Sequence, residues 1–136
     1  MSAWTLDALD TAVAREWLTD VMQTTDFSLL EEALELVLDT TEGYLERADA
    51  ERACAAAELT AAALAHPGPT FAEHAGLARW LTGVRTNPDA ELVRAARRAT
   101  ARVLAPDSEL REVWEDSDAF DAWLAGLYDL RERLLP

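Results

Sequence analysis

The chain has 136 residues and a formal net charge of −14, from 26 acidic residues against 12 basic ones, all of them arginine. Phosphate backbones are bound by basic surfaces, so this charge disfavours direct binding to nucleic acid. The single cysteine, Cys54, excludes an intramolecular disulfide, and no apolar run approaches the ~20 residues that span a membrane. We expect one domain over residues 1–136, no membrane partner and, because the N-terminus lacks signal-peptide features, a cytoplasmic location.

The charge is unevenly distributed along the sequence. Residues 1–66 carry fourteen acids and three arginines (−11), residues 67–105 three acids and six arginines (+3), and residues 106–136 nine acids and three arginines (−6). We therefore expect partial neutralisation within the fold. The remaining acidic surface would either keep the protein soluble or bind a basic partner.

The first half of the sequence predicts three helices. Apolar residues recur at helical spacing over residues 7–22 and again after Ser28, which has capping-box spacing with Glu31. Asp49 is expected to cap a third helix that is rich in alanine and reaches about Ala65. The sequence HPGPT then ends that helix.

The second half predicts four shorter helices. Thr70 and Glu73 repeat the capping-box spacing before a helix that ends near Gly83, and Asn87 followed by Pro88 predicts the start of the next. The stretch APDSELREVW predicts a sixth helix. The last helix is expected to have an inner face of Phe120, Trp123, Leu124, Leu127 and Leu134. Without any strand pattern, the sequence predicts an all-α fold, a compact bundle of six to seven short to medium helices.

Three stretches carry a resemblance to a known family. They are AAAEL in the third helix, PDSEL with DSD between Pro106 and Asp118, and the terminal FDAWLAGLYDLRERL. Over nearly its whole length the chain resembles the bacterial proteins grouped as domain of unknown function 4259. That family usually opens with glycines around a tryptophan, then an Asn-Asp pair and a second tryptophan. Trp4 and Trp17 match this opening, but its glycines, asparagine and aspartate are replaced here by Ser2, Thr5, Asp7, Thr11 and Ala12. The resemblance implies the fold and no activity.

A cluster of acids among aromatic rings follows the sixth helix. A calcium loop needs a glycine at its sixth position, but counting from Asp116 that position is Asp121. A di-iron site in a helix bundle uses Glu-x-x-His pairs. The residues three positions before His66 and His74 are Ala63 and Phe71, so this motif is absent as well. We therefore predict no metal, cofactor or catalytic residue here. A helix junction is favoured, with Glu115 and Asp116 as candidate contacts for a partner.

Four arginines form the only concentrated positive charge. Arg94, Arg97, Arg98 and Arg102 spread over one side of the fifth helix, opposite its apolar face. We expect them to pair with acids of the first three helices, and the alternative is that they bind a carboxylate or phosphate. Trp4, before the first helix, is a candidate docking ring, whereas the other four tryptophans are expected in the core.

These patterns favour a non-catalytic protein-interaction module of the toxin-neutralising or regulatory type. Its partner would be another protein, in particular a basic one, and no cofactor is expected. The alternative is a metal-independent enzyme or small-molecule binder with a tryptophan-lined pocket and carboxylate or arginine groups. The candidate contacts are Trp4, Arg94, Arg97, Arg98, Arg102, Glu115 and Asp116.

Overall fold

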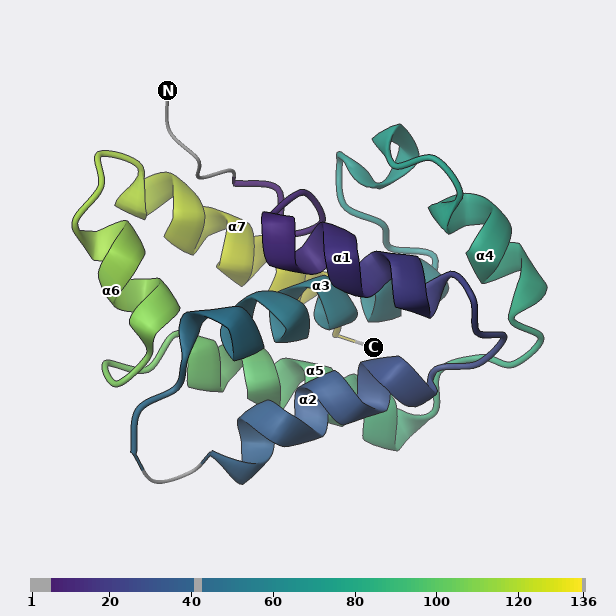
Figure 1. Cartoon of the computed structure of the whole chain (residues 1–136), viewed down its shortest axis with the longest axis horizontal. Helices are drawn as coiled ribbons and strands as arrows, with labels where there is room; N and C mark the ends of the chain where they lie inside the picture. Colours follow the sequence, from purple (N-terminus) through teal and green to yellow (C-terminus); the bar gives the residue numbers. More distant parts are fainter. Residues whose placement is uncertain (1–5, 41–42, 136) are drawn as a thin grey trace.

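The computed structural model describes residues 6–40 and 43–135, and within these ranges it is helical without a strand (Figure 1). This confirms the all-α prediction. The elements are α1 (Ala12–Val21), α2 (Ser28–Asp39), α3 (Arg47–Ala63), the 3₁₀ helix η1 (Phe71–Glu73), α4 (Leu77–Gly83), α5 (Ala90–Val103), α6 (Glu109–Glu115) and α7 (Phe120–Arg133). No helix in the described ranges is long and apolar enough to cross a membrane.

Helix α3 is the centre of the bundle. It contacts α1, α2, α5, α6 and α7, and Figure 1 shows α1 and α7 on the side of α3 opposite to α2. Most of its buried residues are alanines. Small side chains let neighbouring backbones approach closely, so the alanine-rich sequence suits a helix that is surrounded on several sides.

The core is formed by the apolar faces that the sequence predicts. Trp80, Trp114 and Trp123 are buried, and Trp17 packs half-buried against the same cluster. The indole N–H of Trp80 donates to the carbonyl oxygen of Thr24 at 3.0 Å, which satisfies its polar atom. The prediction of four core tryptophans is therefore confirmed for three and partly confirmed for Trp17.

Several helix starts differ from the predictions. The carboxylate of Asp26 accepts from the amide and hydroxyl of Ser28 at 3.0 and 2.6 Å, so the capping box of Ser28 with Glu31 is wrong. Thr70 likewise makes no side-chain cap. Helix α5 begins two residues after Pro88, where Asp89 accepts from the amide of Leu92 at 2.8 Å.

The start of α3 depends on a distant helix. It begins at Arg47, whose amide donates to the carboxylate of Glu109 in α6 at 2.8 Å. Asp49 instead lies in the first turn of α3, where it accepts from Arg52 at 3.2 Å. The predicted Asp49 cap is therefore wrong. Local spacing could not show a cap that is supplied from α6.

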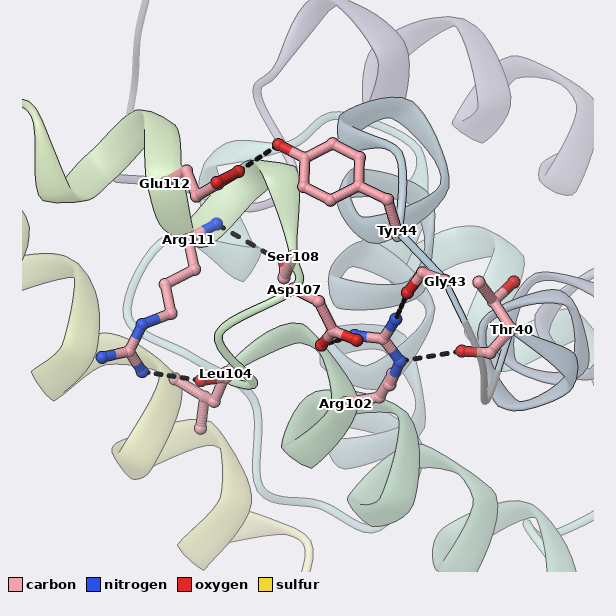
Figure 2. Close-up of polar contacts among 9 residues, drawn as sticks. All are labelled: Thr40, Gly43, Tyr44, Arg102, Leu104, Asp107, Ser108, Arg111 and Glu112. Carbon is pink, nitrogen blue, oxygen red and sulfur yellow. Dashed lines mark hydrogen bonds and ion pairs between the residues drawn. The ribbon is translucent and has the colours of Figure 1, made fainter.

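Arg102 joins the segment after α2 to the end of α5 (Figure 2). Its guanidinium donates to the carbonyl oxygens of Thr40 and Gly43 at 2.8 and 3.0 Å, and to Asp107 at 3.0 Å. Beside it, the amide of Leu45 donates to the carbonyl of Asp107 at 2.9 Å. The α2–α3 and α5–α6 connections are thus joined by hydrogen bonds from both the Arg102 side chain and the backbone.

The same connection carries an exposed tyrosine. The hydroxyl of Tyr44 donates to the carboxylate of Glu112 (Figure 2). Because this hydrogen bond requires the phenol proton, it raises the pKa of Tyr44 to about 12. Tyr44 therefore anchors the connection to α6 as a neutral donor.

Candidate functional site

A cleft of about 440 Å³ lies between α1, α3 and α7, with α6 at one end. One wall is apolar and comes mainly from α6 and α7. It includes Trp114, Trp123, Leu127 and Leu130, all of which also belong to the buried core. The sequence prediction that Trp123 and Leu127 are core residues is confirmed, and both also border this space.

The floor of the cleft is a polar stripe along α3. Arg47, Glu51, Cys54 and Glu58 follow one another at three- or four-residue spacing, which places them on one face of the helix. Glu51 is only 5% exposed, and its carboxylate accepts from the Nε of Arg47 at 2.7 Å. The ion pair compensates part of the cost of burying the carboxylate.

The second floor carboxylate is held from α7. The two terminal nitrogens of Arg133 donate to the two carboxylate oxygens of Glu58 at 3.0 and 2.9 Å. The Nε of Arg133 donates to Asp129 at 2.8 Å. This two-bond geometry fixes the orientation of both groups, so the polar floor is preformed.

Cys54 lies between the two floor carboxylates. It is buried, and burial raises the pKa of the thiol to about 12, with further contributions from the charges of Glu58 and Glu51. The thiol therefore stays protonated at neutral pH. Because the thiolate is the nucleophilic form, Cys54 is a packing residue and a weak hydrogen-bonding group in the cleft. This is consistent with the packing role that its sequence context favours.

An aromatic stack forms the end wall. The rings of Trp114 and Trp123 are 6.3 Å apart and inclined by 11°, and Phe120 is 6.0 Å from Trp123 at 22°. The guanidinium of Arg111 lies 5.5 Å from the centre of the Phe120 ring. The stack gives the wall a fixed shape at the junction of α6 and α7.

The charges that line the cleft are predominantly negative. Four carboxylates, those of Asp7, Glu51, Glu58 and Asp129, face two guanidinium groups, those of Arg47 and Arg133. Asp7 also accepts from the Nε2 of His74 at 2.7 Å, in the segment before α4. The formal balance of the carboxylates and guanidiniums is −2, which favours a cationic group in the cleft.

The acidic candidates from the sequence lie elsewhere. Glu115 is exposed at the end of α6, where it accepts from Arg111 at 2.9 Å, and Asp116 is exposed at the cap of that helix. Neither lines the cleft. Trp4 lies outside the described residues. In the part of the chain that the structure describes, no group of three or more His, Cys, Asp or Glu side chains is placed to hold a metal ion.

The four arginines of α5 have separate surroundings. Arg102 pairs with Asp107 and reaches the connection after α2. Arg94, Arg97 and Arg98 make no ion pair with any residue of the ranges 6–40 and 43–135. The expected pairing with acids of the first three helices is therefore wrong for all four, since Arg102 pairs instead with Asp107 in the connection between α5 and α6. Arg94 and Arg97 line a second cavity instead.

Sequence reasoning missed the floor of the cleft. Glu51 and Glu58 receive no role from the sequence patterns, although most of their neighbours in α3 are small apolar alanines, which indicate a helix with neighbours on several sides. That contrast was the available signal. When a helix is covered on several sides, a carboxylate on one of its faces is itself partly buried. Such a carboxylate needs a charged partner, because burying an unpaired charge is costly.

The chain matches the model of one protein family over most of its length. It belongs to the family described as domain of unknown function (DUF4259), whose model matches residues 2–126. This confirms the resemblance. No curated protein and no solved structure matches the sequence.

Proposed function

We propose that the protein is a non-catalytic binding protein for a small organic molecule, which it takes up in the cleft between α1, α3 and α7. The observation that carries this proposal is the preformed polar floor beneath an apolar wall. Glu51 and Glu58 are each fixed by an arginine, while Trp114 and Trp123 supply a rigid apolar surface. Binding sites for small molecules commonly measure ~300–1,000 Å³ and combine these features.

The chemistry of the cleft favours a ligand with an apolar body and a cationic group. The formal charge of −2 among the lining carboxylates and guanidiniums attracts a cation. An alkyl or aryl body would pack against Leu127 and Leu130. A primary or quaternary amine with a short hydrophobic chain has both features.

Binding rather than catalysis is supported by the groups at the floor. The Cys54 thiol is held protonated by burial, and neither His66 nor His74 lines the cleft. A nucleophile with an adjacent base is thus missing from the residues that line it. The expectation of a basic protein partner for the acidic surface stays a prediction.

The test uses three probes of equal chain length and different charge. Octylamine, 1-octanol and octanoate are titrated into the full chain by isothermal titration calorimetry, with tryptophan fluorescence as a second readout. We expect octylamine to bind about tenfold or more tighter than octanol, a difference of ~1.4 kcal/mol. Equal affinity for amine and alcohol would contradict the role of the carboxylates.

A blocking variant identifies the site. Gly126 lines the cleft on α7, and a Cβ added there meets no atom within 4 Å. Gly126→Leu should therefore fold and project its side chain into the cleft, abolishing octylamine binding. The matched control is Gly83→Leu, also at an unobstructed helical glycine but outside the cleft. Octylamine binding that survives in Gly126→Leu, or is lost equally in the control, would place the site elsewhere.

A further inference from the structure

A second cavity, of about 360 Å³, lies where the C-terminal ends of α3 and α7 meet the N-terminal half of α5. Its lining is apolar except for three side chains, those of Arg94, Arg97 and His66. Within the ranges 6–40 and 43–135, no aspartate or glutamate lines it, although the sequence is rich in acids. This is a basic cavity in an acidic protein.

Its two arginines have no counter-charge among the residues that the structure describes. Neither Arg94 nor Arg97 forms an ion pair within the described ranges. Arg97 is half-buried, and its Nε is shielded from solvent without a hydrogen-bond acceptor among the described groups. A partly desolvated guanidinium interacts more strongly with an anion than an exposed one does, because less water screens the charge. An anion in the cavity would therefore offset an unfavourable burial.

The helix ends around the cavity do not form an anion-binding site of their own, so an anion would depend on the arginines. Asp89 already accepts from an amide in the first turn of α5, at 2.8 Å, so that helix start carries its own anion. The C-terminal ends of α3 and α7 have a partial negative charge that would repel an anion. That repulsion is reduced because the Nδ1 of His66 donates to the carbonyl of Arg133 at 2.9 Å, while Arg133 donates to the carbonyl of His66 at 3.3 Å.

A further arginine adds to the local positive charge. Arg131 is in the last turn of α7, three residues before the C-cap residue Leu134, which lines the cavity. The Nε of Arg131 is also buried without an acceptor. Arg131 does not line the cavity itself, but it places a second guanidinium with a shielded Nε in the last turn of α7, which ends at the cavity.

We propose that this cavity binds a small organic carboxylate with an apolar chain. Its carboxylate would bind the guanidinium groups of Arg94 and Arg97, since planar guanidinium matches carboxylate geometry. Its chain would pack against Val93, Leu134 and Leu135, which supply the apolar part of the lining. The site is separate from the acidic cleft and takes a ligand of opposite charge.

The first arm of the test compares ligands on the unaltered chain. Octanoate, 1-octanol, octylamine, acetate and inorganic phosphate are titrated by isothermal titration calorimetry at low salt. We expect octanoate to bind about tenfold or more tighter than octanol and acetate. Octanol as tight as octanoate would overturn the role of the charge, and acetate or phosphate as tight as octanoate would overturn that of the apolar chain.

The second arm assigns the site. Arg94→Gln with Arg97→Gln should weaken octanoate binding about tenfold or more while octanol binding is unchanged. The matched control, Arg79→Gln with Arg85→Gln, removes two exposed arginines outside both cavities and should retain octanoate affinity. An equal loss in the control would attribute the effect to net charge and overturn the proposal. Octanoate binding should also survive in Gly126→Leu, since that residue lines only the other cleft.

Discussion

Arg133 in α7 binds Glu58 in α3 through both terminal nitrogens, at 3.0 and 2.9 Å, across 75 residues of sequence. The two side chains are only 16% and 17% exposed. The pair thus joins the last helix to the central one within a largely desolvated floor. Removing one partner leaves the other charge without compensation, which is costly even where the intact pair contributes little net stability.

We therefore expect Arg133→Gln to lower the free energy of unfolding by about 2–4 kcal/mol, somewhat less than the ~3–5 kcal/mol seen for fully buried pairs. The control is Arg15→Gln, whose pair with Asp10 is 3.9 Å long and 70% and 52% exposed. It should change stability by less than about 0.5 kcal/mol. Urea unfolding followed by circular dichroism measures both. Similar losses in the two variants would show that burial does not determine the cost.

Arg102 and Arg98 should differ sharply although they are close in sequence. Arg102 donates to two carbonyl oxygens and one carboxylate, whereas Arg98 is exposed. Because hydrogen bonds from charged donors are worth about 1.5–3 kcal/mol, Arg102→Gln should cost at least that amount. Arg98→Gln should stay within about 0.5 kcal/mol. A stability loss for Arg98→Gln that shrinks with added salt would restore the idea that the α5 arginines balance the acidic helices.

The core and the order of helices could be predicted because they depend on local spacing. Trp123 and Leu127 recur four residues apart, and that period alone puts them on one face of α7. The helix starts were less predictable. The start of α3 is stabilised by the carboxylate of Glu109, 62 residues away, and no local pattern identifies such a partner.

The candidate site was beyond sequence reasoning for a related reason. Glu51 and Glu58 become a site only when α7 brings Arg133 and the tryptophan wall over α3. Periodicity assigns a side chain to one face of its own helix, but not to the neighbouring helix that covers this face. The same limit explains Arg97, whose missing partner is visible only after α5 and α7 have been packed together.

The acidic residues where α2 meets α5 predict that the stability of the fold depends on pH. Burial, then the charges of Asp89, Glu35, Asp26 and Glu91, raise the pKa of Glu31 above its ordinary value of 4.5. A raised carboxyl pKa means that the folded state binds the proton more tightly than the unfolded state. The tighter proton binding by Glu31 therefore stabilises the fold fully at pH below 4.5. This stabilisation is lost as pH rises through the folded pKa of Glu31. At pH 7 the charged carboxylate is consequently destabilising.

Glu31→Gln should consequently raise the unfolding free energy at pH 7 by about 0.2–0.5 kcal/mol, the scale of one like-charge pair on a helix. The gain should shrink as pH falls through the folded pKa, because Glu31 then becomes protonated in the fold. Thermal unfolding of both proteins across this pH range measures it. Glu32→Gln, an exposed neighbour on the same helix, is the control and should show a smaller gain. A gain in Glu31→Gln that is constant with pH would exclude titration of this carboxyl as its cause.

Trp123 separates a structural role of the aromatic wall from a ligand-binding one. Its ring is buried between Trp114 and Phe120, at 6.3 and 6.0 Å. Trp123→Ala should lower the unfolding free energy by about 3–5 kcal/mol, because it leaves a cavity and removes both ring contacts. Tyr128→Ala on the same helix removes an exposed ring and should cost less than about 1 kcal/mol. Urea unfolding compares the two. If Trp123→Ala unfolds like the unaltered protein but no longer binds octylamine, the ring belongs to the ligand site and the core does not depend on it.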